Sequence, residues 1–174
     1  AQVTQDAAGL AVNPQVRTAL DYIKSIEAKT IDEQIKITEI PAPTFKEQKR
    51  GEYFRQRFSE IGLKNVRVDK VGNVIGERPG KGGANVPTLV LAAHLDTVFE
   101  DQEVKVIRNG NIIKGLGISD DGRGLTLLLA IAETLEKQKI QTQGNIIFVA
   151  NVAEEGLGDL IGTKHLFNEE LKGR

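Results

Sequence analysis

Two glutamates stand side by side at the end of an apolar run, in the stretch VANVAEEGLGD at residues 149–159. The run 145–153 is typical of a buried strand, and adjacent carboxylates repel each other, so Glu154 and Glu155 need a reason to lie there. Neighbouring side chains of a strand face opposite ways, and a regular strand could not direct both glutamates into one site. We therefore expect the strand to end near Ala153, where glycines follow. The competing interpretation is a solvated loop with one glutamate at a helix N-terminus, which leaves the other unexplained.

A histidine and an aspartate follow a second apolar run, at residues 88–95. His94 and Asp96 are two positions apart, so their side chains point to the same face of a strand. His94 could bind a metal through one ring nitrogen, while Asp96 orients the ring through the other nitrogen or through a nearby contact. By itself the pair is a weak indication, because Asp96 could equally satisfy backbone amides at the end of a strand.

A third acidic cluster lies in the stretch GLGISDDGRG, at residues 115–124. Asp120 and Asp121 stand between glycines, just before a predicted helix. One aspartate could cap that helix, but a cap needs only one. The density of glycines indicates a backbone folded tightly around something. The stretch is not a dinucleotide-binding motif, because the third glycine is missing and acids at its mouth would repel a pyrophosphate.

The elements that must position these clusters alternate between helices and apolar strands. Thr44 and Glu47 resemble a capping box at the start of one helix. The spacing of apolar residues predicts helices over 14–40, 44–62, 122–137 and 160–171, and strands over 65–70, 73–78, 88–95, 104–115 in two short pieces, and 145–153. This order predicts an α/β fold: a three-layer α/β/α domain with a mixed sheet, in which 88–95 and 145–153 are central strands.

The composition of the chain excludes some classes of function and makes others unexpected. The chain has 174 residues, enough for one domain, and a formal net charge of −1, which gives no reason to expect a nucleic-acid or membrane partner. It has no cysteine, which excludes thiol catalysis and thiolate metal sites. Residues 1–13 are small and polar, and we interpret them as a flexible mature N-terminus. This favours a periplasmic or secreted protein, with the cytoplasm as the alternative.

The three acidic clusters share one position in the predicted fold. All of them follow strands or precede helices at the edge where open α/β sheets bind ligands. Carboxylates that meet there repel one another unless cations compensate their charge. Hard oxygen ligands with one imidazole suit zinc, with manganese or cobalt as substitutes. A bridging carboxylate would accommodate two ions about 3.5–4 Å apart, and a carboxylate that binds no metal could serve as general base.

At these residues the sequence resembles the co-catalytic di-zinc peptidases related to aminoacylase, carboxypeptidase G, peptidase T-like tripeptidases and succinyl-diaminopimelate desuccinylase. The motifs HLDTV, GxGxxDDxxG and EEGLGD stand in the order and spacing of that family. The resemblance implies that residues 14–174 are the N-terminal portion of the catalytic domain. The lid domain, the rest of the catalytic domain and the remaining metal ligands would lie outside this sequence, so the domain is expected to be truncated.

The resemblance also implies roles for particular residues. His94 would bind one zinc, and Asp96 would orient the His94 ring. Asp120 would bridge both ions, and the peptide bond between Asp120 and Asp121 is often cis in such proteins. Glu155 would bind the second zinc, and Glu154 would act as general base toward a water that attacks an amide carbonyl.

The implied function is a zinc-dependent hydrolase that cleaves an amide or peptide bond in a small peptide or an N-acyl amino acid. The full-length protein would form a homodimer, whereas the isolated chain would be inactive for lack of ligands. His165, the only other histidine, is interpreted as a surface or interface residue. Two alternatives stay open: a non-catalytic metal- or peptide-binding module on the same scaffold, and a purely structural domain with acidic loops.

Overall fold

A mixed sheet of four strands forms the centre of the domain. The computed structural model describes residues 7–83, 86–100 and 103–173. The strands lie in the order β1-β2-β6-β3, with bounds β1 Lys64–Val68, β2 Val74–Arg78, β3 Thr88–His94 and β6 Asn145–Asn151. The β1–β2 and β2–β6 pairs are antiparallel, whereas β3 runs parallel to β6, so the sheet is mixed as predicted.

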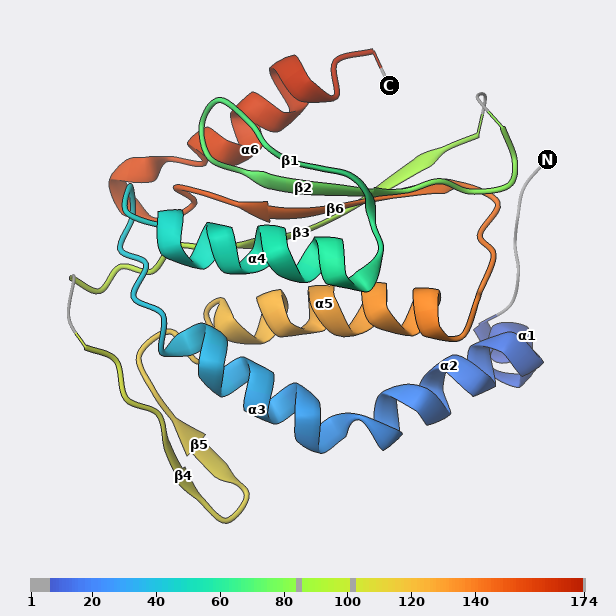
Figure 1. The fold of residues 1–174 in the computed structure, drawn as a ribbon, viewed down its shortest axis with the longest axis horizontal. Helices are drawn as coiled ribbons and strands as arrows, with labels where there is room; N and C mark the ends of the chain where they lie inside the picture. Colours follow the sequence, from blue (N-terminus) through green and yellow to red (C-terminus); the bar gives the residue numbers. More distant parts are fainter. Residues whose placement is uncertain (1–6, 84–85, 101–102, 174) are drawn as a thin grey trace.

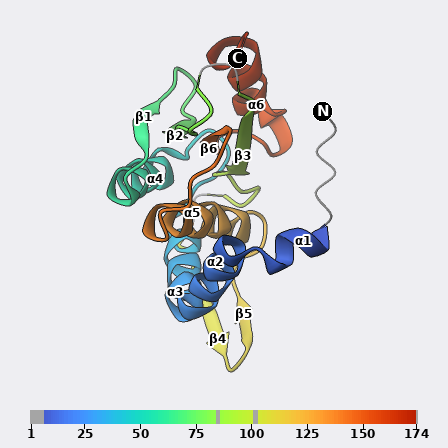
Figure 2. The same ribbon diagram turned by 90° about the vertical axis from the view of Figure 1, so that its right-hand side faces the viewer.

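Helices cover both faces of this sheet. One face packs on α4 and α5, and α6 lies on the other (Figures 1 and 2). Two further helices, α2 and α3, pack on the side of α5 that faces away from the sheet. The helices are α1 Ala7–Val12, α2 Pro14–Ser25, α3 Glu27–Thr38, α4 Gln48–Ile61, α5 Gly122–Lys137 and α6 Ile161–His165, which continues into a wider turn at Leu166–Glu170. The three-layer α/β/α prediction is confirmed, with α2 and α3 added outside it.

Alternation along β6 builds the core on both faces of the sheet. Phe148 belongs to the larger apolar cluster, with Phe54 and Phe58 of α4 and residues of α5. Val149, its neighbour, belongs to the smaller cluster under Leu166. All of these side chains are buried. A continuous apolar run is therefore the expected sequence for a strand that is covered on both faces.

The placement of β3 differs from the prediction. The strand lies in the same sheet as β6 and next to it, but at the edge, because no other described strand pairs with its free side. Leu89 in this strand is 55% exposed. The apolar run correctly predicted a strand. Apolar composition indicates that both faces of a strand are covered, but it does not indicate whether both of its edges are paired. The expectation of a central position was therefore wrong for β3.

The hairpins and the N-terminal region follow the sequence closely. The strands β1 and β2 form one hairpin, and β4 Ile107–Asn109 and β5 Ile112–Lys114 form the other, as predicted. In the segment predicted to be flexible, residues 1–6 lie outside the described residues and 7–12 form α1. Among the helices that the structure describes, none combines the length and the apolar character needed to span a membrane.

The predicted capping box at Thr44 and Glu47 is not formed. The helix α4 begins at Gln48, with Glu47 in the N-cap position and no side-chain cap hydrogen bond. Instead, the Thr44 hydroxyl donates to Asp96, and the Glu47 carboxylate accepts from the backbone N–H of Ala153. Both partners belong to the acidic clusters, so this pair of residues is directed toward them rather than toward its own helix.

Candidate metal centre

The parallel pairing of β3 and β6 brings the acidic clusters to one edge of the sheet. The last residue of β3, His94, lies opposite Asn151, the last residue of β6. The next backbone N–H, that of Leu95, donates to the Asn151 carbonyl at 2.7 Å. The loops that follow both strands therefore leave the sheet together. The clusters do converge there, as the sequence predicted.

His94 contacts two of the predicted site residues. Its Nε2 lies 2.9 Å from Oδ1 of Asp120. Its Nδ1 lies 3.1 Å from the backbone oxygen of Asp96 and 3.5 Å from the Oδ1 carboxylate atom of the same residue. Asp96 therefore holds the ring from behind, while the Nε2 atom is directed to Asp120, whose side chain is 74% exposed. Asp120 is thus available to a further ligand.

The two adjacent aspartates have different surroundings. Asp121 caps α5, because its Oδ1 accepts from the Gly124 N–H at 2.9 Å. Its Oδ2 accepts from the backbone N–H of His94 at 3.1 Å, which ties the helix to the end of β3. The peptide bond between Asp120 and Asp121 is cis, as the resemblance implied. One aspartate is thus the helix cap that sequence reasoning considered, and its neighbour is free to face the histidine.

The glutamate pair turns into the same site. The strand β6 ends at Asn151, and Ala153 has a left-handed conformation with φ of 51°. Such a conformation is unfavourable for a residue with a Cβ atom, by about 1–2 kcal/mol. Beyond this turn, ligand atoms of Glu154, Glu155 and His94 all lie within 4.8 Å of one another. The expectation that the strand ends before the glutamates, so that both can reach one site, is confirmed.

Asp96 holds the backbone of the glutamate pair as well as the histidine. Its carboxylate is fully buried and accepts from the N–H groups of Glu154 and Glu155, each at 3.0 Å. The Thr44 hydroxyl donates to it at 3.0 Å. Burial alone would raise the pKa of Asp96, but hydrogen bonds from His94, from the two backbone amides and from Thr44 outweigh this effect and lower the pKa to about 2. Both contacts considered from the sequence are therefore present, the one with His94 and the one with backbone amides, whereas the Thr44 contact was not predicted.

The charges of the cluster favour a bound cation. Burial disfavours protonation of His94, but the hydrogen bond to Asp96, the charge of Asp121 and the hydrogen bond to Asp120 raise its pKa to about 9. Burial raises the pKa of Asp121. Desolvation and the charge of Asp120 raise the pKa of Glu155. Carboxylates resist ionisation where like charges crowd together. Oxygen donors with one imidazole form the donor set that zinc binds in proteins.

Arg50, which sequence reasoning did not single out, supports the same loops from beneath. It is 1% exposed and donates to the carbonyl oxygens of Leu95 and Ile40, each at 2.6 Å. Burial lowers the pKa of Arg50 to about 10, although the charges of Asp96 and Glu47 oppose this. The available signal in the sequence was a charged residue on the face of a predicted helix that points to the core. Because arginine is almost never fully buried unless it is paired, such a residue indicates a buried structural contact.

A second group with ligand-like spacing lies away from this edge. Atoms of Asp69, His165 and Glu170 fall within 4.8 Å of one another. The His165 side chain is 17% exposed, and its Nε2 is buried 4.0 Å from Asp69, so this nitrogen does not face solvent as a surface residue would; a place at an interface stays a prediction. Asp69 already accepts from three backbone amides and the Asn73 side chain, and Arg67 pairs with Glu170. These contacts explain the carboxylates as structural groups.

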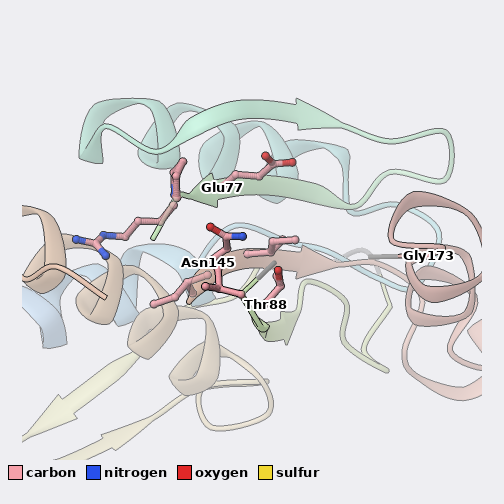
Figure 3. Close-up of a pocket in the computed structure, with 9 residues that line it drawn as sticks. Glu77, Thr88, Asn145 and Gly173 are labelled. Carbon is pink, nitrogen blue, oxygen red and sulfur yellow. The ribbon is translucent and has the colours of Figure 1, made fainter. Parts of the chain in front are cut away.

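A pocket of about 440 Å³ lies at the opposite end of the sheet, where β3 and β6 begin (Figure 3). Thr88 and Asn145, the first residues of the two strands, line it. Asn145 accepts from the Gly80 N–H, and Arg78 is paired with Glu136. Asn145 and Arg78 are thus engaged in contacts within the fold, and no residue of the three acidic clusters lines this pocket.

The sequence is similar to those of proteins of known family. The model of peptidase family M28 matches residues 73–173, more than half of the chain. A protein of Pyrococcus abyssi assigned as a LysW-lysine/LysW-ornithine hydrolase is 36% identical over 129 residues, which are 72% of this chain and 34% of that protein. The chain thus spans about a third of the length of this curated relative.

Solved structures have the same fold. A tripeptidase from Staphylococcus aureus has a TM-score of 0.69 at 26% identity, covering 84% of this chain and 41% of that one. Aminopeptidase PepT from Bacillus cereus has a TM-score of 0.69 at 24% identity, covering 81% and 40%. A dinuclear metal binding peptidase from Bacillus subtilis, at 15% identity, has a TM-score of 0.60 and covers 82% and 40%. The resemblance to this class of peptidases is confirmed, and the chain belongs to peptidase family M28.

Proposed function

We propose that this chain carries one side of the catalytic centre of a zinc-dependent hydrolase that cleaves an amide or peptide bond. The observation that carries the proposal is the convergence of His94, Glu154 and Glu155 within 4.8 Å, with Asp120 in contact with the same histidine. A solvated acidic loop would have no need to bring an imidazole and several carboxylates together against their mutual repulsion. Membership of a peptidase family supports a hydrolytic reaction.

The residues divide into ligands and a base. His94, Asp120 and Glu155 would hold the metal, with Asp120 as the ligand that two ions would share, and Asp96 keeps the imidazole oriented. Bound zinc, or cobalt or manganese in its place, would supply Lewis-acid activation of a water molecule and of the amide carbonyl. Glu154 accepts the proton of the attacking water and passes it to the leaving amine. The Asp96 contact with the backbone N–H of Glu154 holds the segment from which this base projects.

The substrate proposed is a small peptide or an N-acyl amino acid. Relatives and structural neighbours include a protein assigned as a LysW-lysine/LysW-ornithine hydrolase, a tripeptidase and an aminopeptidase; the first name describes hydrolysis, and the other two describe cleavage of peptides. This chain supplies three metal ligands, or two for each ion when Asp120 is shared. Catalytic zinc has three protein ligands as a rule. We therefore propose that the chain alone binds zinc weakly and is inactive, and that activity belongs to the complete protein, which would act as a homodimer.

Two substitutions in the complete protein test these roles. Glu154→Gln should nearly abolish hydrolysis of tripeptides and N-acyl amino acids while the zinc content, measured by mass spectrometry, stays almost unchanged. Asp120→Ala should remove zinc, because a shared ligand serves both ions. Glu169→Gln, a change of an exposed acid outside the cluster, is the matched control and should alter neither quantity. Equal loss of zinc in the Glu154 and Asp120 variants would contradict the assignment of the base, and unchanged turnover in both would contradict the proposed activity.

A further inference from the structure

Three successive backbone amides at the glutamate turn are held by two buried carboxylates. The Ala153 N–H donates to Oε1 of Glu47 at 3.0 Å. The N–H groups of Glu154 and Glu155 donate to the two oxygens of Asp96, each at 3.0 Å. Every amide that sets the direction of the two side chains is therefore fixed by a charged acceptor, and such hydrogen bonds are stronger than neutral ones.

Glu47 is built into this turn from a distant part of the chain. It is 3% exposed, and the residue it holds lies 106 positions away in the sequence. The same Oε1 atom also accepts from the Phe45 N–H at 3.0 Å, which fixes the loop before α4. Glu47 is not part of the group of possible ligand atoms at His94. A buried carboxylate that makes no contact with the proposed reacting groups needs another role, because burial of a carboxylate is costly unless hydrogen bonds satisfy it.

The conformation of Ala153 indicates that role. Its φ of 51° is sterically unfavourable for any residue other than glycine, and a strained residue persists only where its surroundings determine it. The hydrogen bond to Glu47 holds this residue from one side. On the other, a Cβ atom on Gly158 would lie 2.5 Å from the Ala153 carbonyl oxygen, so the chain returns tightly against it. Ala153 ends the buried run that directly follows β6, and its left-handed conformation turns the chain just before Glu154 and Glu155.

Thr44 connects the same loop to the second carboxylate. Its hydroxyl donates to Asp96 at 3.0 Å, and its backbone N–H donates to the Thr97 carbonyl at 3.3 Å. Arg50, one turn along α4 from Glu47, lies buried near both carboxylates, and their charges raise its pKa against the effect of burial. The loop before α4 and its first turn thus supply the Thr44 hydroxyl, the Glu47 carboxylate and the compensating charge of Arg50. These groups support the turn that follows β6, 106 positions after Glu47 in the sequence.

We propose that Glu47, assisted by Thr44, is a positioning residue that holds Ala153 in its left-handed conformation and so aims Glu154 and Glu155 at the metal centre. The inference rests on the proposed function for its catalytic consequence, but the structural part stands separately. Glu47 is not expected to touch substrate, so its removal should act on turnover and on metal retention rather than on substrate binding. Displacement of a reacting group by about 1 Å can lower a rate by about 100-fold.

The test compares three variants of the complete protein. Glu47→Ala should lower kcat by about 100-fold with KM nearly unchanged, weaken zinc binding, and speed hydrogen exchange at the amides of residues 153–155 in the metal-free protein. Glu47→Gln keeps an acceptor oxygen, so it should restore most of the exchange protection and part of kcat. Phe58→Leu, a buried change on the same helix, is the matched control. It should lower stability but leave kcat and exchange at 153–155 as in the wild type.

The outcomes separate the two proposals. Glu47→Ala that loses stability like Phe58→Leu but leaves kcat and exchange at 153–155 unchanged would overturn the positioning role. If Glu47→Ala does not fold, Glu47→Gln decides the question. Its neutral amide oxygen is a weaker acceptor, so a partial loss of exchange protection at 153–155 and of kcat, with neither loss in Phe58→Leu, supports the role. Protection and kcat that both equal those of the wild type refute it. A wild-type protein without zinc-dependent hydrolysis would refute the proposed function, whereas the exchange measurement would still decide whether Glu47 holds the turn.

Discussion

Replacement of Asp96 by asparagine should produce a loss of stability that depends on pH. The carboxylate is fully buried and accepts two backbone amides, the Thr44 hydroxyl and a contact from His94. These partners stabilise the charged form, and the pKa of Asp96 falls from 3.8 to about 2 on folding. At about 1.4 kcal/mol per pKa unit, the charged form contributes about 2.5 kcal/mol to the free energy of unfolding near neutral pH.

The sign of the pH dependence follows from the lowered pKa. A group whose pKa is lower in the folded state contributes its full stability above its unfolded pKa and loses it as the pH falls toward the folded value. The contribution of Asp96 should therefore be complete above about pH 5, fall to about half near pH 3 and vanish below about pH 2. Asp96→Asn should also carry a cost that does not vary with pH, because its amide nitrogen would face a backbone N–H.

Urea unfolding of the metal-free protein, followed by far-ultraviolet circular dichroism at several pH values, measures both parts. The difference between Asp96→Asn and the wild type should shrink as the pH falls from about 5 to about 3. Asp21→Asn, at an exposed position, is the control and should change stability by less than about 0.5 kcal/mol at any of these pH values. A difference for Asp96→Asn that stays constant with pH would refute the argument that backbone amides and His94 hold this carboxylate charged.

Two further predictions concern how the layers hold together. Arg57→Met should destabilise the fold by about 2 kcal/mol, because it removes the ion pair of the mostly buried Glu33 carboxylate, which keeps the hydrogen bond from the Tyr53 hydroxyl. Arg55→Met, which breaks the exposed pair with Glu52, should cost less than about 0.5 kcal/mol. Equal urea midpoints for the two variants would contradict this. Phe148→Ala, which removes a fully buried ring in β6, should cost about 3–5 kcal/mol, and a loss below about 1 kcal/mol would show that the core on that face is not packed as described.

Local patterns predicted the elements well and their partners less well. The predicted helix 122–137 coincides with α5, and the strand over 145–153 contains β6, because apolar spacing and a capping aspartate act within a few residues. The convergence of the acidic clusters after the strands 88–95 and 145–153 could be predicted from two facts. Helices and strands alternate along the chain, and open α/β sheets bind ligands at the carboxyl ends of their strands.

Long-range partners account for most of what the sequence did not reveal. Thr44 and Glu47 have the spacing of a capping box, but their side chains bind Asp96 and Ala153, which lie 52 and 106 positions away. No pattern within one segment encodes that choice. The edge position of β3 was missed for a similar reason, since pairing depends on the strands that are present and not on the residues of β3 itself.

The most direct test of the account locates the metal. Anomalous diffraction at the zinc edge, from crystals of the complete protein grown with zinc, should give two peaks about 3.5–4 Å apart with Asp120 between them, one next to His94 and the other next to Glu155. Peaks at the group formed by Asp69, His165 and Glu170, with none at His94, would contradict the account, as would a single ion that leaves Asp120 uncoordinated.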